Sequence, residues 1–444
     1  MPVSTLGSIS PLEVHVVLAR HLLADGYDFV LDFERSHGAW LHDAKSGREF
    51  LDFCMFFASN PVGYNHPKLR DPEFLEVLHR VASLKPSLPD FYSVEYASFV
   101  ETFGRLAMPE HMRYAFFVEG GALGVENAIK AAFDWKVRRN QAKGIPGEKG
   151  QQVIHFRQAF HGRSGYTLSL TNTDPRKTDY FPKFPWPRID NPGLRFPVTP
   201  EVERDTAEAE TRALDAIERA FAENTDDIAA IIIEPIQAEG GDVHFRPDFL
   251  RALETKAREH DVFFILDEVQ TGVGITGKMW AHEHWGLRPD AVAFGKKLQV
   301  GGCMVGPRVD EAPDNVFKLS SRINSTWGGN LTDMVRSARM LEILVEDGLL
   351  ENARVMGERL LAGLIALAGE TGGKATNARG LGLMLALDLE TPELRERALE
   401  RTQANGLLLL PCGARSIRLR PPLNLAAAEA DTALELVRKS LKEL

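Results

Sequence analysis

Two side chains that could do chemistry stand at the ends of predicted strands. Asp267 follows the apolar run Val262–Leu266, with Glu268 beside it, and Lys296 follows the short apolar run Ala291–Phe294. A carboxylate at the end of a buried strand is costly unless a cation pairs with it. Taken alone, Asp267 would be interpreted as a helix cap or a solvated loop residue. A lysine that also follows a strand favours a shared site.

A lysine and a buried carboxylate fit the chemistry of pyridoxal phosphate. That cofactor needs a lysine that forms a Schiff base with its aldehyde and a carboxylate that keeps its pyridine nitrogen protonated. It also needs backbone amides or a helix N-terminus for its phosphate and a flat group over its ring. The sequence offers candidates for all four needs in loops after predicted strands: Lys296, Asp267, the helix start at Gly120-Gly121, and Phe160.

A glycine string near Asp267 looks like a nucleotide-binding loop but lacks what such loops require. Gly272–Gly277 matches G-x-G-x-x-G, and Lys278 almost completes a phosphate-binding P-loop. The P-loop needs Ser or Thr after the lysine, where Met279 stands, and a dinucleotide site needs a helix directly after the loop. The stretch that follows is soon broken by Gly and Pro. Nucleotide binding is therefore disfavoured.

Composition excludes other classes of protein. The 444 residues are 44% hydrophobic and 26% charged with a formal net charge of -10, which suits a soluble globular protein that does not bind nucleic acid. No apolar run is long enough to span a membrane, and the N-terminus lacks a secretory signal. Three scattered cysteines favour a reducing cytoplasm. We expect no metal site, because neither they nor His282 and His284 have zinc spacing; the two histidines are interpreted as surface residues.

Alternating strands and helices predict an α/β domain. Continuous apolar runs separated by helical stretches indicate a mostly parallel sheet buried on both faces. The polar, proline-rich residues 174–200 are predicted to be an irregular surface excursion. The predicted strands are Tyr114–Val118, Gln152–Phe156, Ile228–Ile233, Val262–Leu266 and Ala291–Phe294, and the predicted helices are Gly124–Asn140, Thr206–Ala222 and Pro247–Glu259.

The length of the chain predicts two lobes instead of one core. The large domain covers residues 66–330, and the pattern changes after Gly328-Gly329. Residues 331–444 are expected to form a smaller α+β domain. The N-terminal segment, residues 1–65, is expected to pack with the small domain. The elements predicted for these two parts are strands Ala39–Leu41 and Glu49–Asp52, helices Met334–Val345 and Ala426–Leu444, and short strands near Gly382–Leu387 and Ile417–Leu419.

The order of these motifs resembles that of the class III aminotransferases, most closely the L-lysine 6-aminotransferases among them. The family signature is an Asp-Glu pair that closes an apolar strand, a glycine loop, and then Asp-x-x-x-x-Gly/Ser/Ala-Lys. Here the first part runs from Phe264 to Gly272 and the second from Asp290 to Lys296. The resemblance covers almost the whole chain. It implies the α/β fold of type I pyridoxal-phosphate-dependent transferases and a homodimer with a shared active site.

The resemblance assigns roles around the cofactor. Lys296 becomes the Schiff-base lysine, with Lys297 as the competing lysine, and Asp267 becomes the partner of the pyridine nitrogen. The chain departs from the family at Gly120–Ala122, which lacks hydroxyl groups, so the phosphate would rest on backbone amides. The other implied contacts are Gly121 and Ala122 at the phosphate, Phe160 and Val269 on the two ring faces, Gln270 near the phenolic oxygen, and Thr326, whose hydroxyl meets the phosphate of the neighbouring subunit.

The resemblance also assigns substrate contacts. Arg163 would hold the distant carboxylate of either substrate, because a guanidinium binds carboxylates bidentately. Arg418 would bind the α-carboxylate of the keto acid, and Glu239 would pair with Arg418 while lysine is bound. Arg420 is interpreted as a solvated neighbour. Gln270 and Asn324 complete the implied substrate contacts.

The implied reaction transfers the ε-amino group of L-lysine to 2-oxoglutarate. It gives 2-aminoadipate 6-semialdehyde, which cyclises, and L-glutamate, with Lys296 as the proton-transfer base. The alternatives are an ω-aminotransferase for ornithine or 4-aminobutyrate and a decarboxylase or isomerase of the same fold. A non-enzymatic cofactor-binding protein is a further alternative, but it predicts the loss of Lys296 or Asp267, and both are present.

Overall fold

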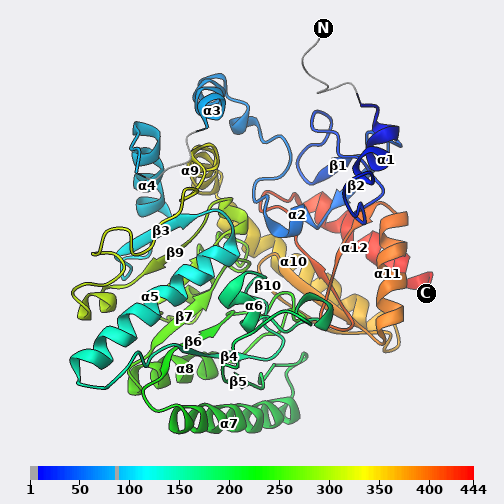
Figure 1. The fold of residues 1–444 in the computed structure, drawn as a ribbon. Coiled ribbons are helices and arrows are strands. Elements are labelled where there is room, and N and C mark those ends of the chain that lie inside the picture. The colour runs from blue at the N-terminus through cyan, green and yellow to red at the C-terminus, as the bar shows by residue number, and fades with distance from the viewer. Residues whose placement is uncertain (1–8, 86–89) are drawn as a thin grey trace.

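Three β-sheets organise the chain (Figure 1). The computed structural model describes residues 9–85 and 90–444, so residues 1–8 of the expected N-terminal segment lie outside the described part. The largest sheet has the strand order β3-β9-β8-β7-β6-β4-β5. Its strands are β3 (Tyr114–Val118), β4 (Gln152–Phe156), β5 (Arg188–Ile189), β6 (Ile228–Ile233), β7 (Phe263–Asp267), β8 (Ala291–Phe294) and β9 (Gly301–Val305).

The prediction of a mostly parallel sheet is confirmed, with one exception. β9 runs antiparallel to both of its neighbours, β3 and β8. The sequence analysis missed this strand, because it opens with two glycines and glycine is depleted in strands. The structure explains why glycine stands in this strand: a Cβ on Gly302 would collide with the carbonyl oxygen of Phe116 on β3.

Both faces of this sheet are buried, as the continuous apolar runs predicted. In β6, Ala230 and Ile232 belong to one hydrophobic core, and Ile231 and Ile233 belong to the other. Helix α5 (Gly121–Ala142) packs across β9, β8 and β6, and α8 (Pro247–Glu259) packs on β7 and β6. The two cores are separate because successive side chains of a strand point to opposite faces.

Helix starts follow their caps more closely than their hydrophobic pattern. α7 (Pro200–Glu223) begins earlier than predicted, because the Thr199 side chain accepts a hydrogen bond from the Val202 amide and Pro200 occupies the first turn. Residues 174–199 are irregular apart from a short 3-10 turn and β5. The other helices of this region are α3 (Pro72–Leu84), α4 (Val94–Leu106) and α6 (Gly165–Leu170).

The C-terminal part contains a second sheet, of order β10-β11-β14-β13. α10 was not predicted. It contains glycines, which lower helix propensity, and a Cβ on Gly357 would lie against the carbonyl oxygen of Gly382. Gly357 therefore allows α10 to pack closely against the turn between β10 and β11. The elements are α9 (Leu331–Glu346), α10 (Leu349–Glu370), β10 (Ala375–Leu381), β11 (Met384–Leu389), α11 (Pro392–Ala404), β13 (Leu410–Cys412), β14 (Ser416–Leu419) and α12 (Ala427–Lys442).

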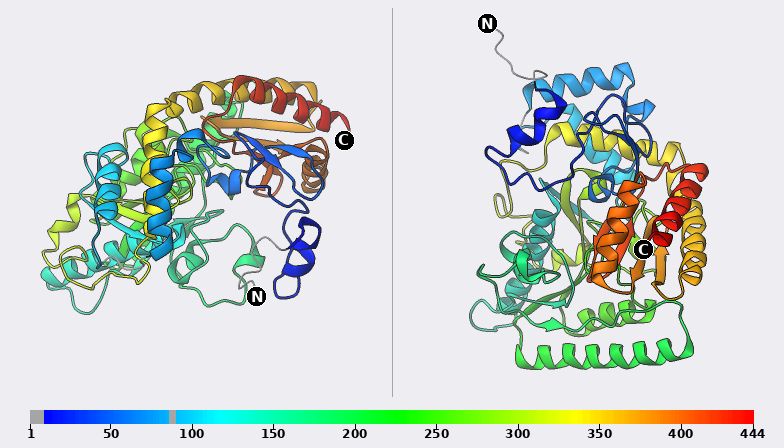
Figure 2. Two further views of the ribbon diagram at one scale, coloured as in Figure 1. Left: turned by 90° about the horizontal axis from the view of Figure 1, so that it is seen from above. Right: turned by 90° about the vertical axis from the view of Figure 1, so that its right-hand side faces the viewer.

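A third sheet joins the two ends of the chain. β1 (Trp40–His42) pairs with β2 (Glu49–Asp52), and β2 pairs in parallel with β12 (Leu407–Leu408). Figure 2 shows the N-terminal strands beside the C-terminal elements in both views. No helix within residues 9–85 and 90–444 is long and apolar enough to cross a membrane.

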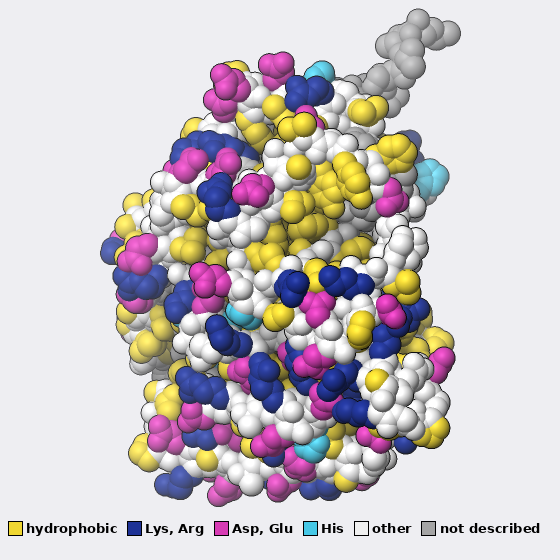
Figure 3. Space-filling model, turned by 90° about the vertical axis from the view of Figure 1, so that its left-hand side faces the viewer, with side chains coloured by type: hydrophobic (Ala, Val, Ile, Leu, Met, Phe, Trp, Pro, Cys, Tyr) yellow, Lys and Arg dark blue, Asp and Glu magenta, His cyan; other side chains and the backbone are white. Residues whose placement is uncertain are grey.

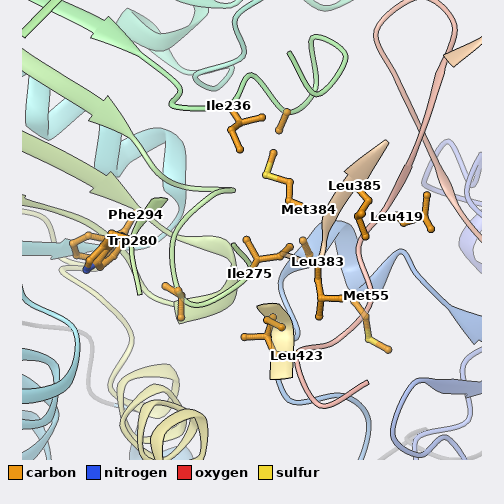
Figure 4. Close-up of a cluster of buried hydrophobic side chains, with 14 of the residues drawn as sticks. Met55, Ile236, Ile275, Trp280, Phe294, Leu383, Met384, Leu385, Leu419 and Leu423 are labelled. Atoms are coloured by element: carbon orange, nitrogen blue, oxygen red, sulfur yellow. The ribbon is translucent and has the colours of Figure 1, made fainter. Parts of the chain in front are cut away.

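The glycine string 272–277 is a packing contact between the large sheet and the C-terminal part. The Leu383 amide donates to the carbonyl of Ile275 at 2.8 Å, and Figure 4 shows Ile275 beside Leu383 and Leu423. A Cβ on Gly274 would lie 2.8 Å from a methyl carbon of Leu423. The glycines thus serve close approach, in agreement with the rejection of a nucleotide loop.

Candidate active site

The parallel strands bring their carboxyl ends to one edge of the large sheet. β3, β4, β6, β7 and β8 run in the same direction, since β3 and β8 are both antiparallel to β9. The loops at this edge enclose a cavity of about 270 Å³. Its lining includes Gly121, Ala122, Phe160, His161, Gly162, Arg163, Glu234, Glu239, Asp267, Val269, Gln270 and Lys296. The structure therefore brings together the predicted cofactor contacts of this chain except Thr326.

Asp267 ends β7 and is buried, with 4% of its surface exposed. One carboxylate oxygen lies 2.7 Å from Nδ1 of His161, and the other accepts the Val269 amide at 3.0 Å. Burial opposes protonation of His161, but the hydrogen bond and negative charge of Asp267 outweigh it and raise the pKa of the imidazole. His161 is thus the group that pairs with the buried carboxylate.

Glu234, which directly follows β6, is a third buried titratable group in this cavity. Its two oxygens accept the amides of Phe160 at 3.0 Å and Ala238 at 3.1 Å. Burial, together with the charge of Asp267 and against the effect of His161, raises the pKa of Glu234 to about 7. Sequence reasoning missed Glu234, although its position after a buried strand is the signal that identified Asp267.

Lys296 and Lys297 differ in where their amines lie. Lys296 lines the cavity, and burial, followed by the charge of Arg418, lowers the pKa of its amine to about 8. Its backbone φ is 28°, a strained value for a residue with a side chain, of the kind found at functional sites. The Lys297 amine instead donates to the backbone carbonyl of Gln270 at 2.6 Å. The geometry thus favours Lys296 over Lys297 as the reactive lysine.

The start of α5 can hold an anion. Among the described residues, no side chain caps its first amides, and a Cβ on Gly120 would meet no atom within 4 Å. Free amides and the helix dipole together attract negative charge. On the other side, a Cβ on Gly121 would lie 2.7 Å from a methyl group of Val269. Glycine is therefore required at position 121, where a side chain would collide with Val269.

A larger cavity of about 760 Å³ adjoins the first and shares Phe160, Arg163, Glu239, Gln270 and Lys296 with it. Arg418 and Lys177 also line it, as does Phe57.

Phe57 belongs to a turn that the sequence analysis did not foresee. Met55, Phe56, Phe57 and Ala58 all have positive φ, from 43° to 64°. Each left-handed residue with a Cβ costs roughly 1–2 kcal/mol, so surrounding contacts must maintain the turn. No propensity signal would have revealed it.

Glu239 and Arg418 do not pair in this structure. The Glu239 carboxylate pairs with the Lys177 amine, and Arg418 Nη1 donates to Gln270 Oε1 at 3.3 Å. The interpretation of Arg420 as solvated is wrong. Its side chain is fully buried, it pairs with Asp242, and its Nε donates to Gln270 Oε1 at 3.1 Å.

Asn324 and Thr326 line neither of the two cavities. Thr326 is exposed, and Asn324 Oδ1 accepts the Ser325 amide at 2.7 Å. The loop lies against residues outside the site: the Lys85 amine lies 5.1 Å from the ring centroid of Trp327. The chain itself thus does not bring this predicted pair to its own site.

The interpretation of His282 as a surface residue is also wrong. His282 is buried, and its Nδ1 lies 2.7 Å from Glu268. The Glu268 carboxylate also accepts hydrogen bonds from Thr271 Oγ1 and the Ala281 and His282 amides. Glu268 lines neither cavity and instead fixes the glycine loop.

Comparison with known proteins agrees with this geometry. The family model for aminotransferase class-III matches residues 23–441. The L-lysine-epsilon aminotransferase of Amycolatopsis lactamdurans is 51% identical over 433 residues, which cover 97% of this chain and 95% of that protein. That of Streptomyces clavuligerus is 48% identical over 440 residues, covering 99% and 96%. The solved structure of lysine aminotransferase from M. tuberculosis has a TM-score of 0.96 at 50% identity, covering 98% of this chain and all of that one.

Proposed function

The chain belongs to the class III aminotransferases, and we propose that it transfers the ε-amino group of L-lysine to 2-oxoglutarate, with pyridoxal phosphate as its cofactor. The products are L-glutamate and 2-aminoadipate 6-semialdehyde, which cyclises. The observation that carries the proposal is the pair of adjoining cavities. One holds a lysine of lowered pKa and a buried aspartate, and the other holds the cations that recognise carboxylates.

The groups that line the smaller cavity fit pyridoxal phosphate. When bound, this cofactor supplies an aldehyde that accepts amines and a protonated ring that withdraws electrons. Lys296 would attach to it, and Asp267, held by His161, would keep the ring nitrogen protonated. The amides of Gly121 and Ala122 would bind the phosphate at the uncapped start of α5. Phe160 and Val269 would cover the ring faces, with Gln270 near its oxygen.

Lys296 also suits proton transfer. Because the pKa of its amine is about 8, about a tenth of the amine is neutral at pH 7 and about half at pH 8. Only the neutral amine accepts a proton, so Lys296 Nζ can take one from the substrate carbon that bears the amine. An ordinary lysine, with a pKa near 10.5, would be almost wholly charged.

The larger cavity suits two substrates that differ in their carboxylates. 2-Oxoglutarate has one carboxylate beside its reacting carbon and a second further away, whereas lysine presents methylene groups beside the reacting end. Arg163 would hold the distant carboxylate of each substrate. Arg418, which is 5% exposed, would bind the near carboxylate of the keto acid. Asn324 would contribute from the partner subunit.

An apolar surface supports assembly as a homodimer. Figure 3 shows hydrophobic side chains gathered on one face of the molecule. Contiguous exposed apolar surface of this kind marks interaction sites. Thr326 lies beside Trp327, whose ring contacts Lys85. The loop that would enter the partner's site therefore adjoins segment 75–100, which carries several exposed apolar residues. The exposed apolar residues of the described parts of segment 75–100 are Leu75, Leu84, Phe91, Tyr92, Val94 and Val100.

We expect residues 66–330 to form the large domain, with residues 331–444 and the N-terminal residues 1–65 forming the small one. The β1-β2-β12 sheet, which joins the two ends of the chain, supports this division. Cys54, Cys303 and Cys412 are buried free thiols, which supports a cytoplasmic location.

A panel assay tests the function. Purified protein is incubated with 2-oxoglutarate and L-lysine, L-ornithine or 4-aminobutyrate, and L-glutamate is measured. L-Lysine is expected to give the highest kcat/KM, at least ~10-fold above ornithine, since one methylene group supplies discrimination of that scale. A higher kcat/KM for ornithine or 4-aminobutyrate would contradict the choice of lysine. Sedimentation of the same sample is expected to give the mass of two chains.

A further inference from the structure

Lys177 has no role in the sequence motifs, yet it lies inside the larger cavity. It ends the short 3-10 turn Pro175–Lys177 within segment 174–199, and its amine pairs with Glu239 from the loop after β6. The same amine lies 5.6 Å from the ring centroid of Phe160. The side chains of Lys177 and Glu239 are 23% and 20% exposed, so both groups are largely withdrawn from water. Solvent and salt screen such a partly buried pair less than they screen an exposed one.

Arg418, on β14, pairs with no carboxylate of residues 9–85 and 90–444. Its Nη1 reaches only the neutral oxygen of Gln270, and its buried Nε has no hydrogen-bond partner within the described residues. A buried guanidinium with an unsatisfied donor is costly, which favours the arrival of a carboxylate. The remaining carboxylates of this cavity are engaged: Asp174 pairs with Arg176, and Glu396 pairs with Arg395.

Glu239 instead pairs with Lys177, and the family resemblance assigns it Arg418 as a second partner, so it can serve two alternative cations. Arg163 and Arg418 both act electrostatically on Lys177, which places all three cations around a common space. With a substrate carboxylate on Arg418, Glu239 needs another cation nearby. Without such a cation, its charge would stay in a partly dry cavity that now also holds the substrate's charge.

We propose that Lys177 is the alternative partner of Glu239, a positioning residue that releases Arg418 for the keto acid. When Glu239 lies on Lys177, as in this structure, Arg418 is open to the carboxylate of 2-oxoglutarate. When Glu239 moves to Arg418, the charge of the arginine is neutralised beside the methylene groups of lysine. Lys177 thus sets how readily one site alternates between the two substrates. This inference rests on the proposed function.

Glutarate tests the inference without turnover. It has both carboxylates of 2-oxoglutarate but no carbonyl, so its binding to the holoenzyme can be measured by calorimetry. In Lys177→Met, Glu239 loses this partner. Glutarate then occupies both Arg163 and Arg418 with its two carboxylates, so none of these cations is left to receive Glu239. Glutarate is expected to bind ~10-fold more weakly, in line with coupling energies of close charge pairs. Lys177→Arg should restore binding, and Lys183→Met, which removes the same charge from the same segment, should leave it unchanged.

The KM for L-lysine separates positioning from direct contact with substrate. In Lys177→Met it should stay within ~2-fold of the wild-type value or fall, because Glu239 then favours Arg418. A parallel loss of lysine and glutarate binding would mean that Lys177 is structural or binds substrate itself, and would overturn the inference.

A double-mutant cycle with Glu239→Gln gives the decisive comparison. Once the carboxylate is gone, no group needs the alternative partner, so Lys177→Met should no longer weaken glutarate binding. An equal weakening in both backgrounds would show direct binding by Lys177, and no weakening in the wild-type background would show that Lys177 is not needed; either result overturns the proposal. The double-mutant cycle measures glutarate binding and involves no amine donor. Its result can therefore be interpreted even if the panel assay shows that L-lysine is not the preferred substrate.

Discussion

Replacing Asp267 with asparagine should reduce turnover by at least ~10²-fold while the protein stays folded. The substitution keeps the size of the side chain and an oxygen that can accept the Val269 amide. It removes the negative charge that His161 holds at 2.7 Å and that the ring nitrogen of the cofactor requires. The pKa of His161, which Asp267 raises, should fall in this variant.

The size of the effect follows from the burial of the carboxylate. Two unit charges 4 Å apart interact by about 4 kcal/mol at an effective dielectric constant of 20, a value suited to partly dry protein sites. Asp267 is 4% exposed, so water cannot replace the lost charge. The polar asparagine recovers part of the interaction, which leaves about 2.7 kcal/mol, or about 100-fold in rate.

Glu268→Gln is the matched control. Glu268 is the adjacent carboxylate, is 1% exposed and lies 2.7 Å from His282, but it lines neither cavity. Its loss should lower the free energy of unfolding by about 2 kcal/mol, the scale of a charged hydrogen bond, and spare most of the turnover. Rates are compared in single-turnover experiments with L-lysine, and stability is compared by chemical denaturation. Near-normal turnover in Asp267→Asn, or equal losses in both variants, would refute the role of Asp267.

Three further predictions follow from buried groups. Lys296→Ala should lose the visible absorbance of the lysine-bound cofactor and turnover, whereas Lys297→Ala should keep both; borohydride reduction and peptide mapping that placed the cofactor on Lys297 would contradict this. Only the neutral amine of Lys296 attaches to the cofactor. The rate of attachment to the apoenzyme should therefore rise roughly 10-fold between pH 7 and pH 9, through the pKa of about 8, and then level off. A rate that does not depend on pH would argue against a lowered pKa. Asp242→Asn should lower the free energy of unfolding in denaturant titrations by about 3 kcal/mol, because it leaves Arg420 buried without its charge partner; an unchanged midpoint would show that the backbone carbonyls alone satisfy Arg420.

The sequence predicted the strands of the large sheet well, for a physical reason. β3, β4, β6 and β8 have the predicted bounds, since a strand buried on both faces is a continuous apolar run that ends where polar loop residues begin. The same strand ends carry the candidate site, so a reliable strand also places Asp267 and Lys296. Glycine-rich elements such as β9 and α10 were missed because glycine lowers local propensity, whereas the tertiary structure needs it for close approach.

The partners of side chains were less predictable than their positions in the chain, as Arg418 and Arg420 show. Arg418 lies on β14 and Arg420 directly follows the end of that strand. The family resemblance makes one a ligand, and the other was interpreted as a solvated neighbour. The structure buries both of them around the same Gln270 oxygen and gives only Arg420 a carboxylate, Asp242. That distinction depends on residues distant in sequence, which no local pattern contains. Because Asp242 is committed to Arg420, the carboxylate for Arg418 has to come from Glu239 or from the substrate.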